Sequence, residues 1–265
     1  MIFYFSCTGN TRWVASEISK WTGDRLVAID MTARDLSFDP SHTPLSSDES
    51  IGFCFPVHGW RPPLELREWL KRASLPDCTG RYVWALCTMG DTVGEAMDLF
   101  ASDLSARGIE IDSRYSVQMP ETYIGLPGMN TDTIEMERCK IAAAREKVED
   151  IARQIAARTK GAEDVYKGHW PRVNSRFIGS VFVHHLLSDK PFRVDPEKCS
   201  GCGRCSRVCP VGNIEMDSSH TPSWQHNGRC MSCFACYHHC RERAISYSWH
   251  TRGKGQYYFG KNDEK

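Results

Sequence analysis

Eight of the cysteines in this sequence are concentrated in the stretch from Cys199 to Cys240, and their thiolates could bind metal. The pattern C-x-x-C-x-x-C-x-x-x-C occurs there twice, and the second copy follows the first by 31 residues (Cys199 to Cys230). Three thiolates at i, i+3 and i+6 can wrap three corners of an iron–sulfur cube, and the fourth cysteine of such paired motifs reaches the other cube. This rule predicts two [4Fe–4S] clusters, one on Cys199, Cys202, Cys205 and Cys240 and one on Cys230, Cys233, Cys236 and Cys209.

Two other uses of cysteine fit these motifs less well. A zinc ribbon uses two C-x-x-C pairs and stops at four ligands, whereas here a third cysteine follows at the same spacing in both copies. A disulfide framework belongs to secreted domains, and nothing in the sequence indicates secretion. A zinc-stabilised interaction module is therefore kept as the non-redox alternative.

The segment from about Pro191 to Ile245 resembles the bacterial-type ferredoxins with two clusters, and the resemblance implies a small α+β domain. Ile214 and Ile245 each lie five residues past the fourth cysteine of their copy, so the duplication includes apolar positions. Pro210 follows the fourth cysteine of the first copy, as is usual in that family, but Arg241 stands at the equivalent place in the second. Because proline is not a ligand, we expect both clusters to be retained. The effect of the Arg241 charge is left open.

The composition is that of a soluble globular protein of 265 residues, which leaves room for two domains. Lys plus Arg and Asp plus Glu number 33 each, and this balance argues against a nucleic-acid partner. We expect no signal peptide before the first strand-like run, and no apolar run approaches the ~20 residues of a membrane span. The remaining cysteines are scattered and odd in number, as expected in a reducing cytoplasm: Cys7, Cys54, Cys78, Cys87 and Cys139.

The N-terminal segment begins with a strand, a polar loop and a helix. Residues 2–5 are apolar, and apolar residues then recur at helical spacing from Trp13 to Trp21. The backbone N–H groups of a loop at a helix N-terminus suit a phosphate, and the loop adds the donors of Ser6, Thr8, Asn10 and Thr11, with Gly9 allowing close approach. It is not a Walker A loop, because no Lys-Ser or Lys-Thr follows the glycine. The alternative is a plain turn and helix cap.

Strands and helices then alternate. Strands are predicted at 25–30, 51–55, 82–86 and within 109–123, and helices at 64–73, 94–106 and 131–158. This alternation predicts an α/β fold with a doubly wound parallel sheet of five strands covered on both faces. In such sheets ligands bind at the carboxyl ends of the strands, where the winding direction switches.

Residues 1–159 resemble a flavodoxin, through three loops at these strand ends: FSCTGNTR, FPVHGWRPP and CTMGDTVGE. The resemblance implies an FMN cofactor. Trp60 would stack on the flavin ring, and the Gly59 peptide would be free to flip toward the ring N5. The residues carried over are Ser6, Cys7, Thr8, Gly9, Asn10 and Thr11 for the phosphate, Pro56, Val57, His58, Gly59 and Trp60 along the ring, and Thr88, Met89, Gly90 and Asp91 at the pyrimidine edge.

The third loop departs from flavodoxins that act as electron carriers, because it lacks the usual second aromatic residue. We therefore expect the other ring face to be more open, or to be covered from elsewhere. Asp91 is expected to be a solvated carboxylate, with a proton relay as the alternative. Cys54 and Cys87 are expected to be buried as small apolar residues, and Cys7 is given no chemistry.

Residues 160–190 form a predicted connector, irregular at first and then helical, with apolar residues at helical spacing from Val173 to Leu186. We expect this helix to pack across both domains, and the alternative is that it lies on a membrane surface. Four histidines are expected at the surface: His184, His185, His238 and His239.

The order of these parts, with the cluster domain at 191–265, resembles the fused flavodoxin–ferredoxin proteins common in anaerobes. The resemblance implies a cytoplasmic electron-transfer flavoprotein that exchanges electrons with a redox partner protein, either a ferredoxin or an oxidoreductase. The alternative is an FMN-dependent reductase that acts on a small-molecule acceptor. No G-x-G-x-x-G follows a strand, so direct reaction with NAD(P)H is not expected.

Overall fold

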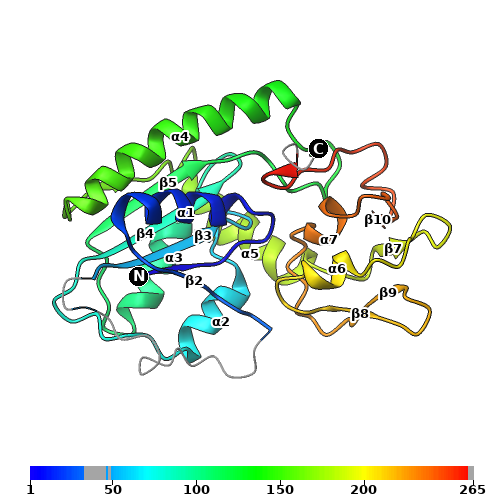
Figure 1. Ribbon diagram of the computed structural model, residues 1–265, viewed down its shortest axis with the longest axis horizontal. Helices are drawn as coiled ribbons and strands as arrows, with labels where there is room; N and C mark the ends of the chain where they lie inside the picture. Colours follow the sequence, from blue (N-terminus) through cyan, green and yellow to red (C-terminus); the bar gives the residue numbers. More distant parts are fainter. Residues whose placement is uncertain (33–45, 47–48, 262–265) are drawn as a thin grey trace.

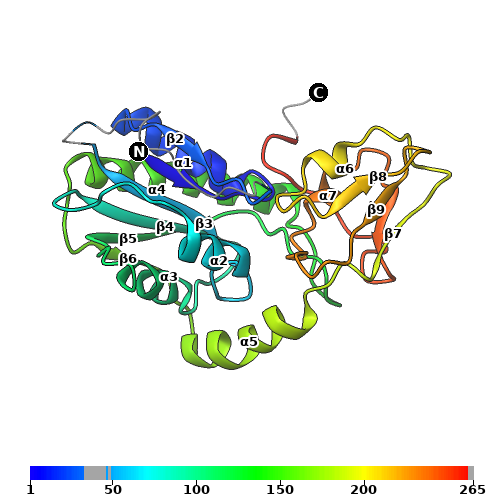
Figure 2. The same cartoon turned by 90° about the horizontal axis from the view of Figure 1, so that it is seen from below.

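The computed structural model describes residues 1–32, 46 and 49–261, and Figure 1 shows a larger α/β part beside a smaller part built by the second half of the chain. In Figure 2 the smaller part lies beyond one end of the sheet, toward which β1 (Ile2–Tyr4) runs. Within the described ranges no helix is long and apolar enough to cross a membrane.

The sheet has the order β2-β1-β3-β4-β5-β6, and all of its pairings are parallel. The first five strands follow the flavodoxin-like order 2-1-3-4-5. Their bounds are β1 Ile2–Tyr4, β2 Leu26–Ala28, β3 Ile51–Pro56, β4 Val83–Met89 and β5 Ser113–Gln118. The prediction of five strands missed β6 (Glu163–Asp164), which lies in the segment predicted as an irregular connector. These two acidic residues are exposed and carry no apolar pattern that could reveal a strand.

Helices cover both faces of the sheet. On one face α1 (Asn10–Thr22) packs with α4 (Ile134–Ala156), and their apolar residues join one core cluster. On the other face α2 (Leu64–Arg72) packs with α3 (Ala96–Ser105). Along β3 alternate side chains enter opposite cores, because successive residues of a strand point to opposite faces. A strand buried on both sides is therefore apolar throughout, and Cys54 and Cys87 are buried as predicted.

The smaller part contains two antiparallel strand pairs and two short helices. Each cysteine loop is followed by a one-turn helix, α6 (Arg204–Arg207) or α7 (Ala235–His238), and then by a strand, β8 (Ile214–Met216) or β10 (Ile245–Tyr247). β10 pairs with β7 (Phe192–Val194), and β8 pairs with β9 (Pro222–Trp224). Ile214 and Ile245 are both buried in its core, so the apolar positions of the duplication are confirmed.

The predicted connector helix is present from Val173 to Leu186, largely in wide π-type turns: η1 (Val173–Ile178), α5 (Gly179–Val181) and η2 (Phe182–Leu186). Its inner side packs on the α/β part through Ser175, Gly179 and Phe182. The hydroxyl of Ser175 donates to the carbonyl of Trp60 (2.9 Å) and accepts from the N–H of Glu95 (2.7 Å). His184 and His185 are exposed, as expected.

The last described residues form a C-terminal arm, 249–261, which returns to the start of α1 (Figure 1, red). The ring of Phe259 stacks on Trp13, with centroids 4.9 Å apart, and its N–H donates to the carbonyl of Thr8. The hydroxyl of Tyr257 donates to Oδ1 of Asn10 (2.7 Å). The arm therefore ties the end of the second domain to the first loop of the sheet.

His238 corrects the expectation of a surface residue. Its side chain is 1 % exposed and joins three segments. Nε2 lies 2.8 Å from the carbonyl of Thr122, and Nδ1 lies 3.1 Å from the N–H of Tyr257, so it accepts there and donates to Thr122. His239 is half-buried and stacks on Tyr258. A contact with residues so distant in the sequence leaves no local pattern, which is why the burial was missed.

Candidate functional site

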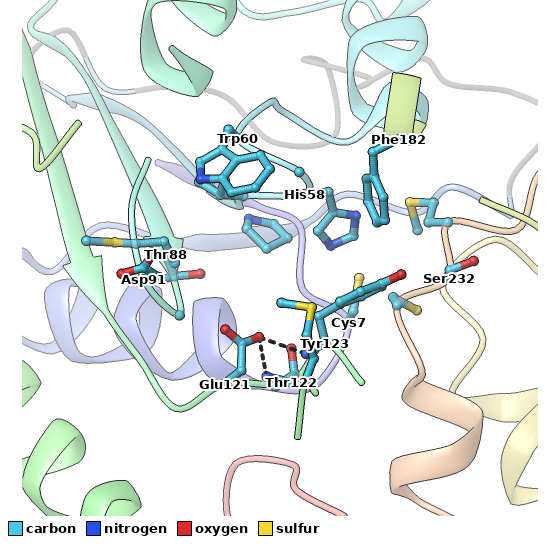
Figure 3. Close-up of a pocket in the computed structure, with 18 of the residues that line it drawn as sticks. Cys7, His58, Trp60, Thr88, Asp91, Glu121, Thr122, Tyr123, Phe182 and Ser232 are labelled. Atoms are coloured by element: carbon cyan, nitrogen blue, oxygen red, sulfur yellow. Dashed lines mark hydrogen bonds between the residues drawn. The ribbon is translucent and has the colours of Figure 1, made fainter. Parts of the chain in front are cut away.

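A cavity of about 560 Å³ lies where the carboxyl ends of β1, β3 and β4 meet the smaller part. The strand order reverses direction between β1 and β3, so this is the switch point at which such sheets bind ligands. Figure 3 shows part of its lining. All the residues predicted from the three loops line it, except Gly9: Ser6, Cys7, Thr8, Asn10, Thr11, Pro56, Val57, His58, Gly59, Trp60, Thr88, Met89, Gly90 and Asp91.

The first loop leads into α1 through Gly9, whose φ of 95° favours glycine. Ser6 Oγ lies in the cavity wall, buried and without a hydrogen-bond partner. The hydroxyl of Thr11 lies 2.8 Å from that of Thr88 and joins the first loop to the third. Gly9 packs instead against the arm, where an added Cβ would lie 3.1 Å from Cβ of Phe259.

Asn10 has two partners that the sequence did not reveal. Its Nδ2 donates to the carbonyl of Pro120 (3.0 Å) and its Oδ1 accepts from Tyr257. The side chain therefore fastens the loop to two distant segments, and its donation to a phosphate through the second amide N–H stays a prediction.

The second loop is a tight turn in which His58 and Arg61 exchange backbone hydrogen bonds of 2.9 and 3.1 Å. Gly59 and Trp60 both have positive φ, 55° and 59°. Trp60 lines the cavity, and its indole Nε1 donates to Oγ1 of Thr92 (3.0 Å), which fixes the ring. Burial in the wall lowers the pKa of His58 to about 4, so the imidazole is neutral at neutral pH.

The connector touches this turn closely. A methyl group on Gly179 would lie 2.2 Å from the carbonyl oxygen of Gly59, and a methyl group on Gly59 would lie 2.6 Å from Cδ1 of Phe182. Two glycines therefore allow the backbone of the connector to rest on the second loop.

Two aromatic side chains from outside the three loops line the cavity, and whether they cover the second ring face stays a prediction. Tyr123 follows β5, Phe182 comes from the connector, and their rings meet edge to face at 5.2 Å. Figure 3 shows Trp60, His58 and Phe182 on one side of the cavity and Tyr123 on the other. The position of Tyr123 just after the last long strand was a usable signal, but nothing local marked Phe182.

Two carboxylates line the cavity. Asp91 is exposed at the rim, in agreement with a solvated side chain. Glu121 was not predicted: burial raises its pKa, and its Oε1 accepts from the N–H groups of Thr122 and Tyr123 at 2.9 and 2.8 Å (Figure 3). Among the described residues that line the cavity there is no lysine or arginine.

Electrostatic contributions link several cysteines of the two motifs, and the assignment of all eight to two clusters stays a prediction. Burial raises the pKa of Cys236, with further contributions from Cys233, Cys230 and Cys209. Burial raises the pKa of Cys205 to about 11, with contributions from Cys240 and Cys202. Cys205 of the first motif also contributes to the raised pKa of Cys236.

The two copies also share a backbone hydrogen bond to sulfur. The N–H of Asn213 donates to Cys209 Sγ at 3.2 Å, and the N–H of Ala244 donates to Cys240 Sγ at 3.3 Å, four residues after the cysteine in each case. Hydrogen bonds to the sulfurs are one of the means by which a protein tunes a cluster.

The second motif reaches the cavity. Met231, Ser232 and Cys233 line it together with the first loop of the sheet. Cys7 and Cys233 both line it, and the neighbouring Cys233 thiol raises the pKa of Cys7. Cys202 of the first motif is exposed, so the first group of cysteines extends to the surface.

Residues 192–241 match the family model of the 4Fe-4S dicluster domain. No curated protein matches the chain. A putative flavoprotein from Bacteroides uniformis is 17% identical over 44% of this chain and 88% of its own, with a TM-score of 0.33. Rubredoxin oxygen:oxidoreductase from Desulfovibrio gigas is 17% identical over 59% of this chain and 36% of its own, with a TM-score of 0.36.

An azoreductase from Bacillus anthracis is 12% identical over 58% of this chain and 98% of its own, with a TM-score of 0.36. These likenesses are slight, and the strand order carries the assignment of the fold. A dicluster domain implies two clusters. The chain therefore joins a flavodoxin-like fold to a C-terminal 4Fe-4S dicluster domain.

Proposed function

We propose that this chain is an electron-transfer flavoprotein, which binds FMN in the cavity and holds two [4Fe–4S] clusters on the eight cysteines of its motifs. One observation carries the proposal: Met231–Cys233 of the second motif and Ser6–Thr8 of the first loop line the same cavity. A ligand in this cavity would lie directly beside a cluster-binding loop.

The residues of the cavity suit FMN. The unpaired hydroxyl of Ser6 and the N-terminus of α1 offer donors to a phosphate without any basic side chain. Trp60, held by Thr92, offers a flat apolar surface for a ring. When bound, the flavin accepts one or two electrons and each cluster one, so the assembly would convert single-electron flow into paired transfer.

The positions of the motifs favour an order for the transfer. Cys233 lines the cavity together with Cys7 of the first loop, so we assign the cluster on Cys230, Cys233, Cys236 and Cys209 to the side of the cavity. We assign the cluster on Cys199, Cys202, Cys205 and Cys240 to the exchange with a partner protein, because Cys202 is exposed. The side chains of Tyr123, Phe182 and Cys7 line the cavity together with Cys233.

The zinc alternative is less well supported. The model that matches residues 192–241 describes a 4Fe-4S dicluster domain. In the ranges that the structure describes, no three His, Cys, Asp or Glu side chains gather as ligands of a single metal ion.

Anaerobic purification followed by metal analysis and rapid mixing tests the proposal. We expect about eight irons per chain, on the two-cube assignment, together with FMN at one per chain. Mixing with reduced ferredoxin should bleach the flavin absorbance. A flavin that stays oxidised would refute the route, and zinc in place of iron would refute the cofactor assignment.

A further inference from the structure

The outer part of the cavity, which we call the mouth, is lined by large apolar side chains from two segments. One segment follows Tyr123 and the other is the connector helix. Each side chain is between 39 and 72% exposed, although all of them line the cavity: Leu126, Met129, Phe177, Ile178, Val181 and Leu186. Apolar side chains exposed together at the edge of a hollow mark a binding site more often than chance exposure does.

The side chains around the mouth offer no positive charge to an anionic ligand, and the mouth lies apart from the backbone donors of the first loop. The described lining contains Asp91 and Glu121 but no lysine or arginine. Basic residues close by are already paired: Arg176 donates to both carboxylate oxygens of Glu95, at 2.7 and 3.0 Å. Lys254 donates to the carbonyls of Ile124 and Leu126. A ligand with phosphate groups, such as a nicotinamide dinucleotide, would meet only carboxylates there.

The mouth also differs from the outer side of the same helix. Val173 is 46% exposed and does not line the cavity, whereas Val181 is 44% exposed and does. The apolar lining therefore continues inward to Phe182 and Tyr123, which meet edge to face. A small molecule that entered the cavity would contact these rings and the lining of the second loop together.

We propose, on the basis of the proposed function, that the mouth binds an uncharged, largely apolar, ring-containing electron acceptor of the quinone class. The step balances as follows: the two carbonyls of the acceptor take up two electrons and two protons and become two hydroxyls. The electrons come one at a time from a reduced partner protein through the loaded chain, and the protons come from solvent. Specificity rests on the apolar contacts of Phe177, Ile178 and Val181.

Two ligands and two variants test the mouth. A methylnaphthoquinone and a naphthoquinone sulfonate share one ring system and differ in charge. Val181→Ser removes apolar surface from the mouth, and Val173→Ser makes the same change on the same helix outside it. Binding to the oxidised, cofactor-loaded protein is measured by calorimetry, and steady-state reduction is measured with reduced ferredoxin as the donor.

We expect the methylnaphthoquinone to bind at least tenfold more tightly than the sulfonate. Val181→Ser should raise both its Kd and its KM by about threefold to tenfold, the range expected for loss of one apolar side-chain contact, with kcat unchanged. Val173→Ser should leave both constants as they are. Equal effects of the two variants, or equal binding of the two ligands, would overturn the proposal.

Two further readings separate the alternatives. Bleaching of the flavin by reduced ferredoxin without any acceptor reports on the proposed function alone, so the mouth can fail while that function stands. If both variants lower binding to anionic lipid vesicles and neither alters the quinone constants, the connector binds a lipid surface and the acceptor proposal is wrong.

Discussion

The contact between the C-terminal arm and the first loop predicts that Tyr257→Phe weakens the flavin site. The Tyr257 hydroxyl donates to Oδ1 of Asn10 at 2.7 Å, and the two side chains are only 3 and 9% exposed. Removing the hydroxyl leaves a buried acceptor without a partner, which costs about 1–3 kcal/mol. Because Asn10 begins α1, part of this loss falls on the loop that lines the cavity.

The loop keeps its other supports in the variant, namely the stack of Phe259 on Trp13 and the hydrogen bond from Phe259 N–H to the Thr8 carbonyl. We therefore assign about 1 kcal/mol of the loss to flavin binding, which corresponds to a Kd about fivefold higher. The remainder should appear as a lower Tm of the whole chain.

Titration of flavin-depleted protein with FMN, followed by quenching of flavin fluorescence, measures the Kd. Tyr247→Phe is the matched control, because its hydroxyl donates to the Ser188 carbonyl at 3.2 Å and the side chain is likewise buried, in the smaller part of the chain. We expect the control to lower the Tm without changing the Kd. An unchanged Kd in Tyr257→Phe, or an equal rise in both variants, would show that the arm does not hold the loop.

Three more outcomes are expected. Cys209→Ala should reduce the iron content from about eight to about four per chain. Cys139 is an exposed cysteine outside the motifs, so Cys139→Ala should leave the iron content unchanged. Equal iron contents in the two variants would contradict the ligand assignment. The hydrogen bonds from Arg176 of the connector hold the pKa of Glu95 below its ordinary value. The pair therefore stabilises the folded chain fully at pH values above the pKa that this carboxyl has in the unfolded chain. The contribution is lost as the pH falls through the folded-state pKa. Glu95→Gln should therefore loosen the connector only slightly at neutral pH, because Arg176 is largely exposed. Amide hydrogen exchange over residues 175–181 should become faster than in the parent protein, and unchanged exchange would count against this docking role. Gly59→Ala should lower the Tm more than Gly80→Ala does. Both glycines have positive φ, but only at Gly59 would the added methyl group lie within 2.6 Å of an aromatic ring. Equal losses of Tm would mean that the contact with the ring contributes nothing and that backbone strain explains both.

Local patterns predicted most of the scaffold. The continuous apolar runs of β3 and β4 and the apolar spacing of α1 are visible within a few residues, because burial on two faces demands them. The cysteine spacing of the two motifs is likewise local. The strand ends placed the three loops at one cavity, and this followed from the parallel arrangement alone.

Contacts between distant segments escaped the sequence analysis. Asn10 carries the side chain of a plausible phosphate donor, and only its pairing with Tyr257 reveals its role. His238 is the last residue of a one-turn helix, where a surface residue might stand, yet it is buried between Thr122 and the arm. β6 has two residues, too few for any period to appear. In each case the stabilising contact is made with a residue far away in the sequence, at a separation that no local pattern reveals.

The backbone of the connector at Gly179 rests against the carbonyl oxygen of Gly59. Rotation of the Gly59 peptide on reduction, as the resemblance to flavodoxins implies, would swing that oxygen away from or into the helix. The packing of the helix would thus change the relative stability of the two peptide orientations, and through it the midpoint potential of the bound flavin. The same helix forms one wall of the mouth. A change in the oxidation state of the flavin would therefore alter the shape of the mouth, where a second molecule enters.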